Sequence, residues 1–157
     1  MKIEFMPYPK TEEPYPLDFA ILTQGKVKIW VDDDLVWNEE DYLGSFIRSL
    51  VLRIASISEG EPACVEHWDS SGFLRLLKNG DWLSVAFGRG QSYGEKPNIT
   101  INQVVECNWM GFLKAATTAT YEFLEWINEN HPALVASKDY QIIQGSLEQI
   151  QERFGPI

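Results

Sequence analysis

The sequence predicts an α+β fold: an antiparallel sheet of about six to eight strands, with two or three helices packed on one face. Several short segments alternate apolar and polar residues, and short turn signals join them, which favours hairpins over crossover connections. Two longer stretches carry apolar residues at intervals of three and four, which is typical of amphipathic helices. The 157 residues match the usual size of one domain, so residues 1–157 are expected to form a single unit.

Strands are expected where apolar residues recur at every second position. In chain order they are Lys2–Met6, Asp18–Thr23, Lys26–Val31, Ala63–Trp68, Phe73–Leu77, Trp82–Phe87 and Asn98–Val105. Val27, Ile29 and Val31 are predicted to share one buried face. Leu83, Val85 and Phe87 are predicted to do the same on a later strand.

Turns are expected between these strands, because Asp, Asn, Ser and Gly tolerate turn geometry. The predicted turns are Gln24-Gly25, the three aspartates Asp32, Asp33 and Asp34, the segment Asp69–Gly72 and the Asn79-Gly80 pair. The glycine-rich segment Gly88–Gly94 is expected to be a flexible hairpin loop. A phosphate-binding loop would need a helix after it, and a strand is predicted there instead.

Three helices are expected. The first has Asn38 as its N-cap, places Glu39, Glu40 and Asp41 in its first turn and continues to Ser58. The second covers Asn108–Asn130 and ends at the His131-Pro132 pair, since the residue before proline disfavours helical geometry. The third covers Gly145–Phe154, where Ser146 and Gln149 match a capping box. Tyr140–Ile143 fits either a strand or a helical turn.

The charge of the chain restricts its partners. Thirteen basic and 23 acidic residues give a net charge of −10. This excess argues against non-specific binding to nucleic acid or to an anionic membrane, both of which need clustered Lys and Arg. It is compatible with a basic protein partner, whose encounter it would accelerate. Solubility alone is the simpler explanation of the charge.

The location is expected to be the cytoplasm. The opening segment MKIEFMPYPK lacks the apolar core of a signal peptide, and no apolar run is long enough to cross a membrane. Two cysteines, Cys64 and Cys107, are few for a disulfide scaffold and fit a reducing compartment, although a disulfide between them stays open.

No motif predicts catalysis, a metal or a cofactor. Cys64, His67 and Asp69 have the residue types of a nucleophile, a base and an orienting acid, but Cys64 and His67 would point to opposite sides of a strand. The three aspartates would also alternate in direction, and the glycine and closing glutamate of a calcium loop are missing. Trp30 shares a predicted strand face with two lysines, where it could anchor an interface or pack internally.

Several stretches together resemble a known group of proteins. They are the opening KIEF, the hairpin KVKIWVDDDLVW, the capped helix from Asn38, the hairpin LLKNGDWLSV and the long helix near the end. This layout resembles small acidic bacterial immunity proteins of polymorphic toxin systems. The resemblance implies a non-catalytic protein that neutralises a cognate toxin by tight association.

No contact residue follows from the resemblance, so the partner-binding residues are predicted from charge alone. The densest acidic segment consists of Asp32, Asp33, Asp34, Glu39, Glu40 and Asp41. It is expected to attract a basic toxin domain. Two other functions stay open: a DNA-mimicking inhibitor, with carboxylates spaced like phosphates, and a small enzyme with a carboxylate pair in a cleft.

Overall fold

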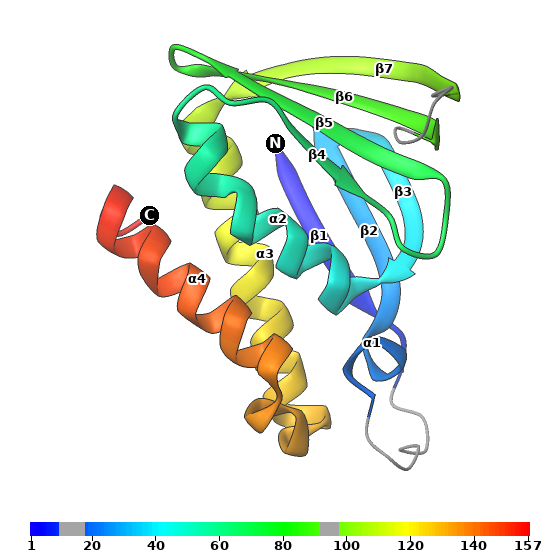
Figure 1. Cartoon of the computed structure of the whole chain (residues 1–157), viewed down its shortest axis with the longest axis vertical. Coiled ribbons are helices and arrows are strands. Elements are labelled where there is room, and N and C mark those ends of the chain that lie inside the picture. Colours follow the sequence, from blue (N-terminus) through cyan, green and yellow to red (C-terminus); the bar gives the residue numbers. More distant parts are fainter. Residues whose placement is uncertain (10–17, 92–97) are drawn as a thin grey trace.

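Seven strands form two antiparallel sheets in the computed structural model, which describes residues 1–9, 18–91 and 98–157. The first sheet has the strand order β1-β2-β3 and the second has the order β4-β5-β6-β7 (Figure 1). The α+β class and the antiparallel pairing are therefore confirmed. The strands nevertheless divide between two sheets, where one sheet was expected.

The described elements alternate between strands and helices along the chain. The strands are β1 (Lys2–Pro7), β2 (Gln24–Val31), β3 (Asp34–Tyr42), β4 (Ala63–Glu66), β5 (Gly72–Asn79), β6 (Trp82–Gln91) and β7 (Asn98–Asn108). The helices are α1 (Phe19–Leu22), α2 (Leu43–Ser58), α3 (Trp109–Asn130) and α4 (Lys138–Phe154), with the short 3-10 helix η1 (Pro132–Ala136) between the last two.

Two predicted hairpins are confirmed. Asp32 and Asp33 form the turn between β2 and β3, and Asp34 begins β3 opposite Val31. Asp32 adopts the left-handed region with φ of 53°, which a short polar side chain tolerates better than most. Gly80, with φ of 61°, begins the turn between β5 and β6. The predicted apolar face of β6, made of Leu83, Val85 and Phe87, is buried.

The strand predicted at Asp18–Thr23 is wrong, because this segment forms the short helix α1. Asp18 caps the helix by accepting the backbone N–H of Ile21 at 3.1 Å. The hydroxyl of Thr23 donates to the carbonyl of Phe19 at 2.7 Å and accepts the backbone N–H of Gly44. Thr23 thus ties α1 to the start of α2, and the turn predicted at Gln24-Gly25 is instead the start of β2.

The helix start predicted at Asn38 is also wrong. Strand β3 continues to Tyr42, and α2 begins only at Leu43. Along this extension Glu39 pairs with Val27, and Asp41 pairs with Gly25. The capping pattern was a genuine local preference, but the ladder with β2 extends through it, and the alternate side chains gain partners in the other sheet.

The last helix starts earlier than predicted. Ser137 caps α4 by accepting the backbone N–H of Tyr140 at 3.2 Å, so Tyr140–Ile143 is helical. Ser146 is no cap: its hydroxyl donates to the carbonyl of Ile142 within α4. Helix α3 matches its prediction, with Asn108 as its N-cap. In the glycine-rich segment, residues 88–91 belong to β6, and residues 92–94 lie outside the described residues.

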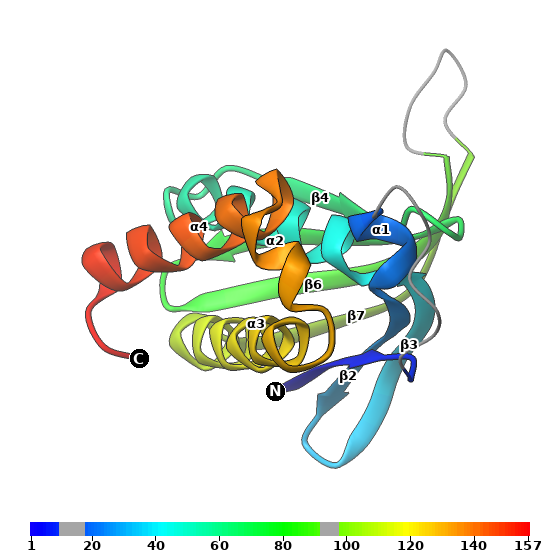
Figure 2. The same ribbon diagram turned by 90° about the horizontal axis from the view of Figure 1, so that it is seen from below.

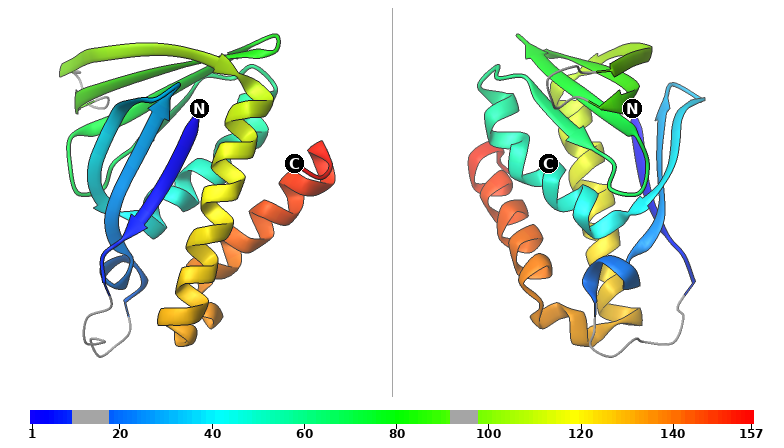
Figure 3. Two further views of the ribbon diagram at one scale, coloured as in Figure 1. Left: turned by 180° about the vertical axis from the view of Figure 1, so that it is seen from behind. Right: turned by 45° about the vertical axis from the view of Figure 1, so that its right-hand side comes forward.

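Helix α2 lies at the centre of the molecule, between the two sheets and α4. It packs against strands of both sheets on one side and against α4 on another, while α3 runs along β1 (Figure 3). Its inward-facing apolar side chains, which include Phe46, Ile47, Leu50 and Ile54, are almost completely buried, while Leu52 on the outer face is exposed. Burying each such side chain contributes about 2 kcal/mol, so α2 supplies much of what holds the two sheets around one core.

Cys64 and Cys107 form no disulfide, so both should react as thiols. Cys107 is buried, and this burial raises the pKa of its thiol. Because the thiolate is the reacting species, Cys107 should react with an aromatic disulfide reagent more slowly than half-buried Cys64, and only at higher pH. Absorbance of the released thiolate measures both rates, with Cys64→Ser to assign them. Equal rates for the two thiols in the folded protein would contradict the structure.

Candidate functional site

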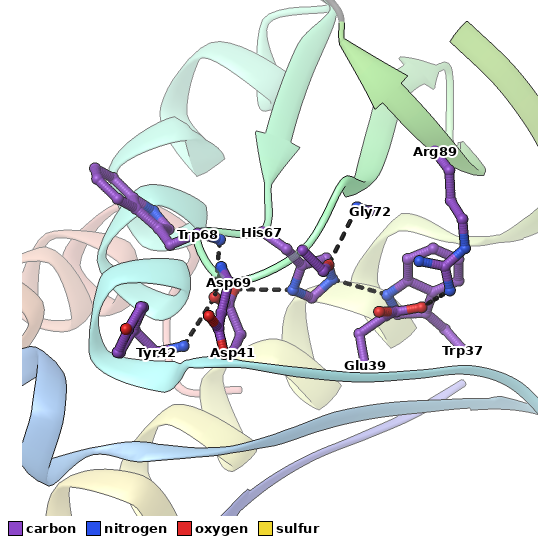
Figure 4. Close-up of polar contacts among 10 residues, drawn as sticks. Trp37, Glu39, Asp41, Tyr42, His67, Trp68, Asp69, Gly72 and Arg89 are labelled. Carbon is purple, nitrogen blue, oxygen red and sulfur yellow. Dashed lines mark hydrogen bonds and ion pairs between the residues drawn. The ribbon is translucent and has the colours of Figure 1, made fainter.

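A buried histidine joins the two sheets. The Nδ1 atom of His67 lies 2.8 Å from Oδ2 of Asp41, and neither side chain has any exposed surface. The indole Nε1–H of Trp37 donates to Nε2 of His67 at 2.9 Å (Figure 4). An indole nitrogen can only donate, so Nε2 is the acceptor and Nδ1 carries the proton given to Asp41. His67 is therefore held as one neutral tautomer.

The same carboxylate also organises the backbone around it. Oδ1 of Asp41 accepts the backbone N–H groups of Tyr42 at 2.8 Å, Trp68 at 2.8 Å and Asp69 at 3.0 Å. Four hydrogen bonds to one buried carboxylate offset much of its lost hydration. Asp41 thereby fixes both the end of β3 and the β4–β5 loop, which we define as residues 67–71.

The imidazole is closely packed and has no surface exposed to solvent. The ring of Phe46 stacks on His67 with centroids 4.7 Å apart. Gly72 lies against the side chains of Trp37 and His67: a Cβ atom there would come within 2.9 Å of Trp37 and 3.0 Å of His67. The backbone N–H of His67 donates to the carbonyl of Gly72, which closes the β4–β5 loop.

A second polar contact joins the sheets beside the first. Arg89 of β6 forms an ion pair with Glu39 of β3, and its guanidinium carbon lies 5.3 Å from the centroid of the Trp37 ring. Trp37, Glu39 and Asp41 alternate along β3, so all three face inward toward the second sheet. We call these three residues, with His67 and Arg89, the inter-sheet network.

This geometry does not place His67 to act as a general base. Both ring nitrogens are used within the inter-sheet network, so His67 is not positioned to activate Cys64 or a substrate. Among the described residues, no group of three or more His, Cys, Asp and Glu side chains could hold a metal ion. What the network does is tie the β4–β5 loop to the end of β3.

The β4–β5 loop places the side chain of Trp68 on the surface. Its side chain is 64% exposed, the largest fraction among the large apolar side chains of the described residues. Figure 4 shows the indole pointing away from His67 and Asp41. The backbone N–H of Trp68 is nevertheless bound to Asp41, so an anchored main chain presents an open aromatic ring.

Two hollows flank Trp68, and both share Glu66, His67 and Trp68 in their walls. One, of about 430 Å³, lies between α2 and β4 and adds Ser49, Arg53 and Cys64. The other, of about 310 Å³, adds Ser70, Ser71, Gly72 and Gly90. Trp68 therefore stands between two depressions, with the end of β4 and the start of the β4–β5 loop.

The predicted acidic segment is divided by the fold. Asp32, Asp33 and Asp34 are exposed at the tip of the β2–β3 hairpin, which projects from the body of the protein (Figure 2). Glu40 is also exposed, and its hydrogen bond with the Tyr8 hydroxyl raises the pKa of Tyr8 to about 12. Glu39 and Asp41 are buried in the inter-sheet network, so these two cannot touch a partner in this fold.

Trp30 lies on the face of the first sheet that points away from the inter-sheet network, and it is half-buried there. The ammonium group of Lys2 lies 5.1 Å from the centroid of its ring, as expected for a cation–π contact. Of the two predicted alternatives for Trp30, this contact favours internal packing.

No protein-family model, curated protein or solved structure matches this chain. Among the described helices, none combines the length and the apolar character that crossing a bilayer requires. The functional conclusion therefore depends on the geometry of the site.

Replacing Asp41 with Asn tests the inter-sheet network. The amide lacks the charge and turns an NH₂ group toward one of the N–H donors, so we expect a loss of about 3 kcal/mol in the free energy of unfolding. The matched control is Glu40→Gln, the next residue on β3 but exposed, which should change it by less than about 0.5 kcal/mol. Urea unfolding measures both. Equal midpoints for the two variants would show that Asp41 does not hold the sheets together.

Proposed function

We propose that this protein is a non-catalytic binding protein that neutralises a cognate protein toxin by tight association, as bacterial immunity proteins do. The observation that carries the proposal is Trp68, a strongly exposed tryptophan on a loop fixed from inside by a buried carboxylate. The proposed setting is the cytoplasm, where both thiols stay reduced.

Leaving Trp68 exposed forgoes the free energy that burying its side chain would contribute to folding, so its exposure needs another explanation. Tryptophan is highly buried on average, because its large apolar surface gains most from leaving water. At protein interfaces, by contrast, Trp is enriched among the few residues that dominate the binding energy. A loop already held in its bound conformation loses little entropy on association, which favours tight binding.

The charges near Trp68 support a basic partner. Glu66 and Asp69 are exposed on either side of it in the sequence, and the exposed Arg53 lines the same hollow as Trp68. The three aspartates of the β2–β3 tip lie at the far end of β3, so they add to the net negative charge and not to the charge beside Trp68. With a net charge of −10, the protein would attract a basic surface from solution before the indole makes contact. We therefore assign Trp68 to affinity and the exposed carboxylates to the rate of association.

The test of the function is co-expression with the products of the genes adjacent to this one. The proposal predicts that one adjacent product arrests growth alone, is tolerated when this protein is present and copurifies with it as a stable complex. If no adjacent product is toxic, or if protection occurs without a complex, the proposal is wrong.

Trp68→Ala should weaken that complex by at least about thirtyfold, because truncating a central aromatic anchor typically costs about 2 kcal/mol or more. Trp82→Ala is the matched control: Trp82 is 58% exposed but lies at the opposite end of the second sheet. Its effect should stay within about threefold. Calorimetric titration measures both affinities, and equal losses would remove Trp68 from the interface.

Reversing the charge of Asp32, Asp33 and Asp34 to Lys should slow association and reduce its dependence on salt, because long-range attraction acts before contact. Reversing Glu122, Glu125 and Glu129 on α3 changes the net charge equally and is the control. Stopped-flow mixing at several salt concentrations measures both rates. A tip variant that associates no more slowly than the control would show that the predicted acidic tip takes no part.

A further inference from the structure

Strand β7 leaves one side of the second sheet open. It is the last strand in the order β4-β5-β6-β7 and forms the upper margin of the sheet in Figure 1. Among the described residues, no backbone hydrogen bond joins its outer edge to another element. The five residues 100–104 are all exposed, so neither face of this part of the strand is covered.

The composition of β7 is unusual for an open edge. Natural edge strands are commonly short, or carry Lys, Pro, inward-facing charges or a bulge that hinder pairing with another chain, and of these devices β7 carries only a bulge, at Asn102. β7 has 11 residues, NITINQVVECN, with Glu106 as its one charged residue and with no proline. In a chain with 23% charged residues, such a long and nearly uncharged edge favours strand-to-strand contact.

A bulge makes this edge self-complementary. Ile101 pairs with Gly88 and Val104 pairs with Ala86, so the register shift at Phe87/Gly88 puts both side chains on the outer face of the sheet. They are 42% and 58% exposed. In an antiparallel pair of two β7 strands, centred between Asn102 and Gln103, Ile101 of each copy falls opposite Val104 of the other.

We propose that β7 pairs with β7 of a second copy of this protein, which joins the two four-stranded sheets across a two-fold axis. This inference is independent of the proposed function. In this register Glu106 faces Ile99 of the other copy, so the two carboxylates are offset by about 23 Å along the strands, well beyond the screening length in physiological salt. The net negative charge of each copy should make dimerisation stronger as salt is raised.

Sedimentation equilibrium over a range of protein concentrations tests the proposal. The unmodified protein should dimerise, and Val104→Glu should weaken the dimer about tenfold, because the two-fold axis counts each lost cross-strand contact twice. Leu77→Lys, at a similarly exposed position on the outer face of β5 but away from the edge, is the control and should leave the dimer unchanged. A protein that is monomeric at every concentration, or a dimer indifferent to Val104→Glu, overturns the proposal.

The register itself has a separate test by charge pairing. Ile101→Lys and Val104→Glu should each dimerise weakly alone, but mixing the two variants should give a heterodimer at least as stable as the original dimer, because the new ammonium and carboxylate groups face one another. Both positions are exposed, so the fold should be retained, and circular dichroism checks this. Mixing that restores no association contradicts the proposed register and, with it, the pairing of β7 with β7.

Discussion

The hydrogen bond between His67 and Asp41 is the contact on which the arrangement of the two sheets depends. It joins the end of β3 to the β4–β5 loop, with no exposed surface on either side chain. A buried carboxylate without partners would be very unfavourable, so the four donors around Asp41 must all be in place together. The position of β4 relative to β3 is thereby fixed to within the tolerance of a hydrogen bond.

This constraint connects the inside of the protein to its surface. The residue that closes the inter-sheet network, His67, is followed directly by Trp68, whose backbone is bound to the same carboxylate. Packing against Phe46 and Trp37 keeps His67 from chemistry and makes it a fixed support. The His–Asp pair, which elsewhere can activate a nucleophile, here has its second nitrogen occupied by an indole.

The sequence predicts elements well where local preferences act alone. Gly80 and Asp32 supply the backbone geometry of their hairpins, and the apolar stripe of α3 needs no distant partner to be recognised. The prediction failed where tertiary contacts override a local signal. Asn38 followed by three acids has the pattern of a helix start, but β3 gains a ladder with β2 and buried contacts with the second sheet by staying extended.

The site was less predictable than the fold for the same reason. The prediction from charge assigns all six acidic residues to partner binding, but a strand alternates its side chains and sends Glu39 and Asp41 inward. Their partners, Arg89 and His67, lie far along the chain, so no local pattern could pair them. The one available signal was the alternation of Trp37, Glu39 and Asp41, which continues the strand period past Asn38.

Determining which ring nitrogen of His67 carries the proton tests this account most directly. Nitrogen-15 NMR of the imidazole distinguishes its two neutral tautomers, and proton exchange reports on the indole N–H of Trp37. The account predicts that Nδ1 carries the proton, that Nε2 carries none, and that the Trp37 indole proton exchanges slowly with solvent. A proton on Nε2, or a rapidly exchanging indole proton, would contradict the inter-sheet network and the anchored presentation of Trp68.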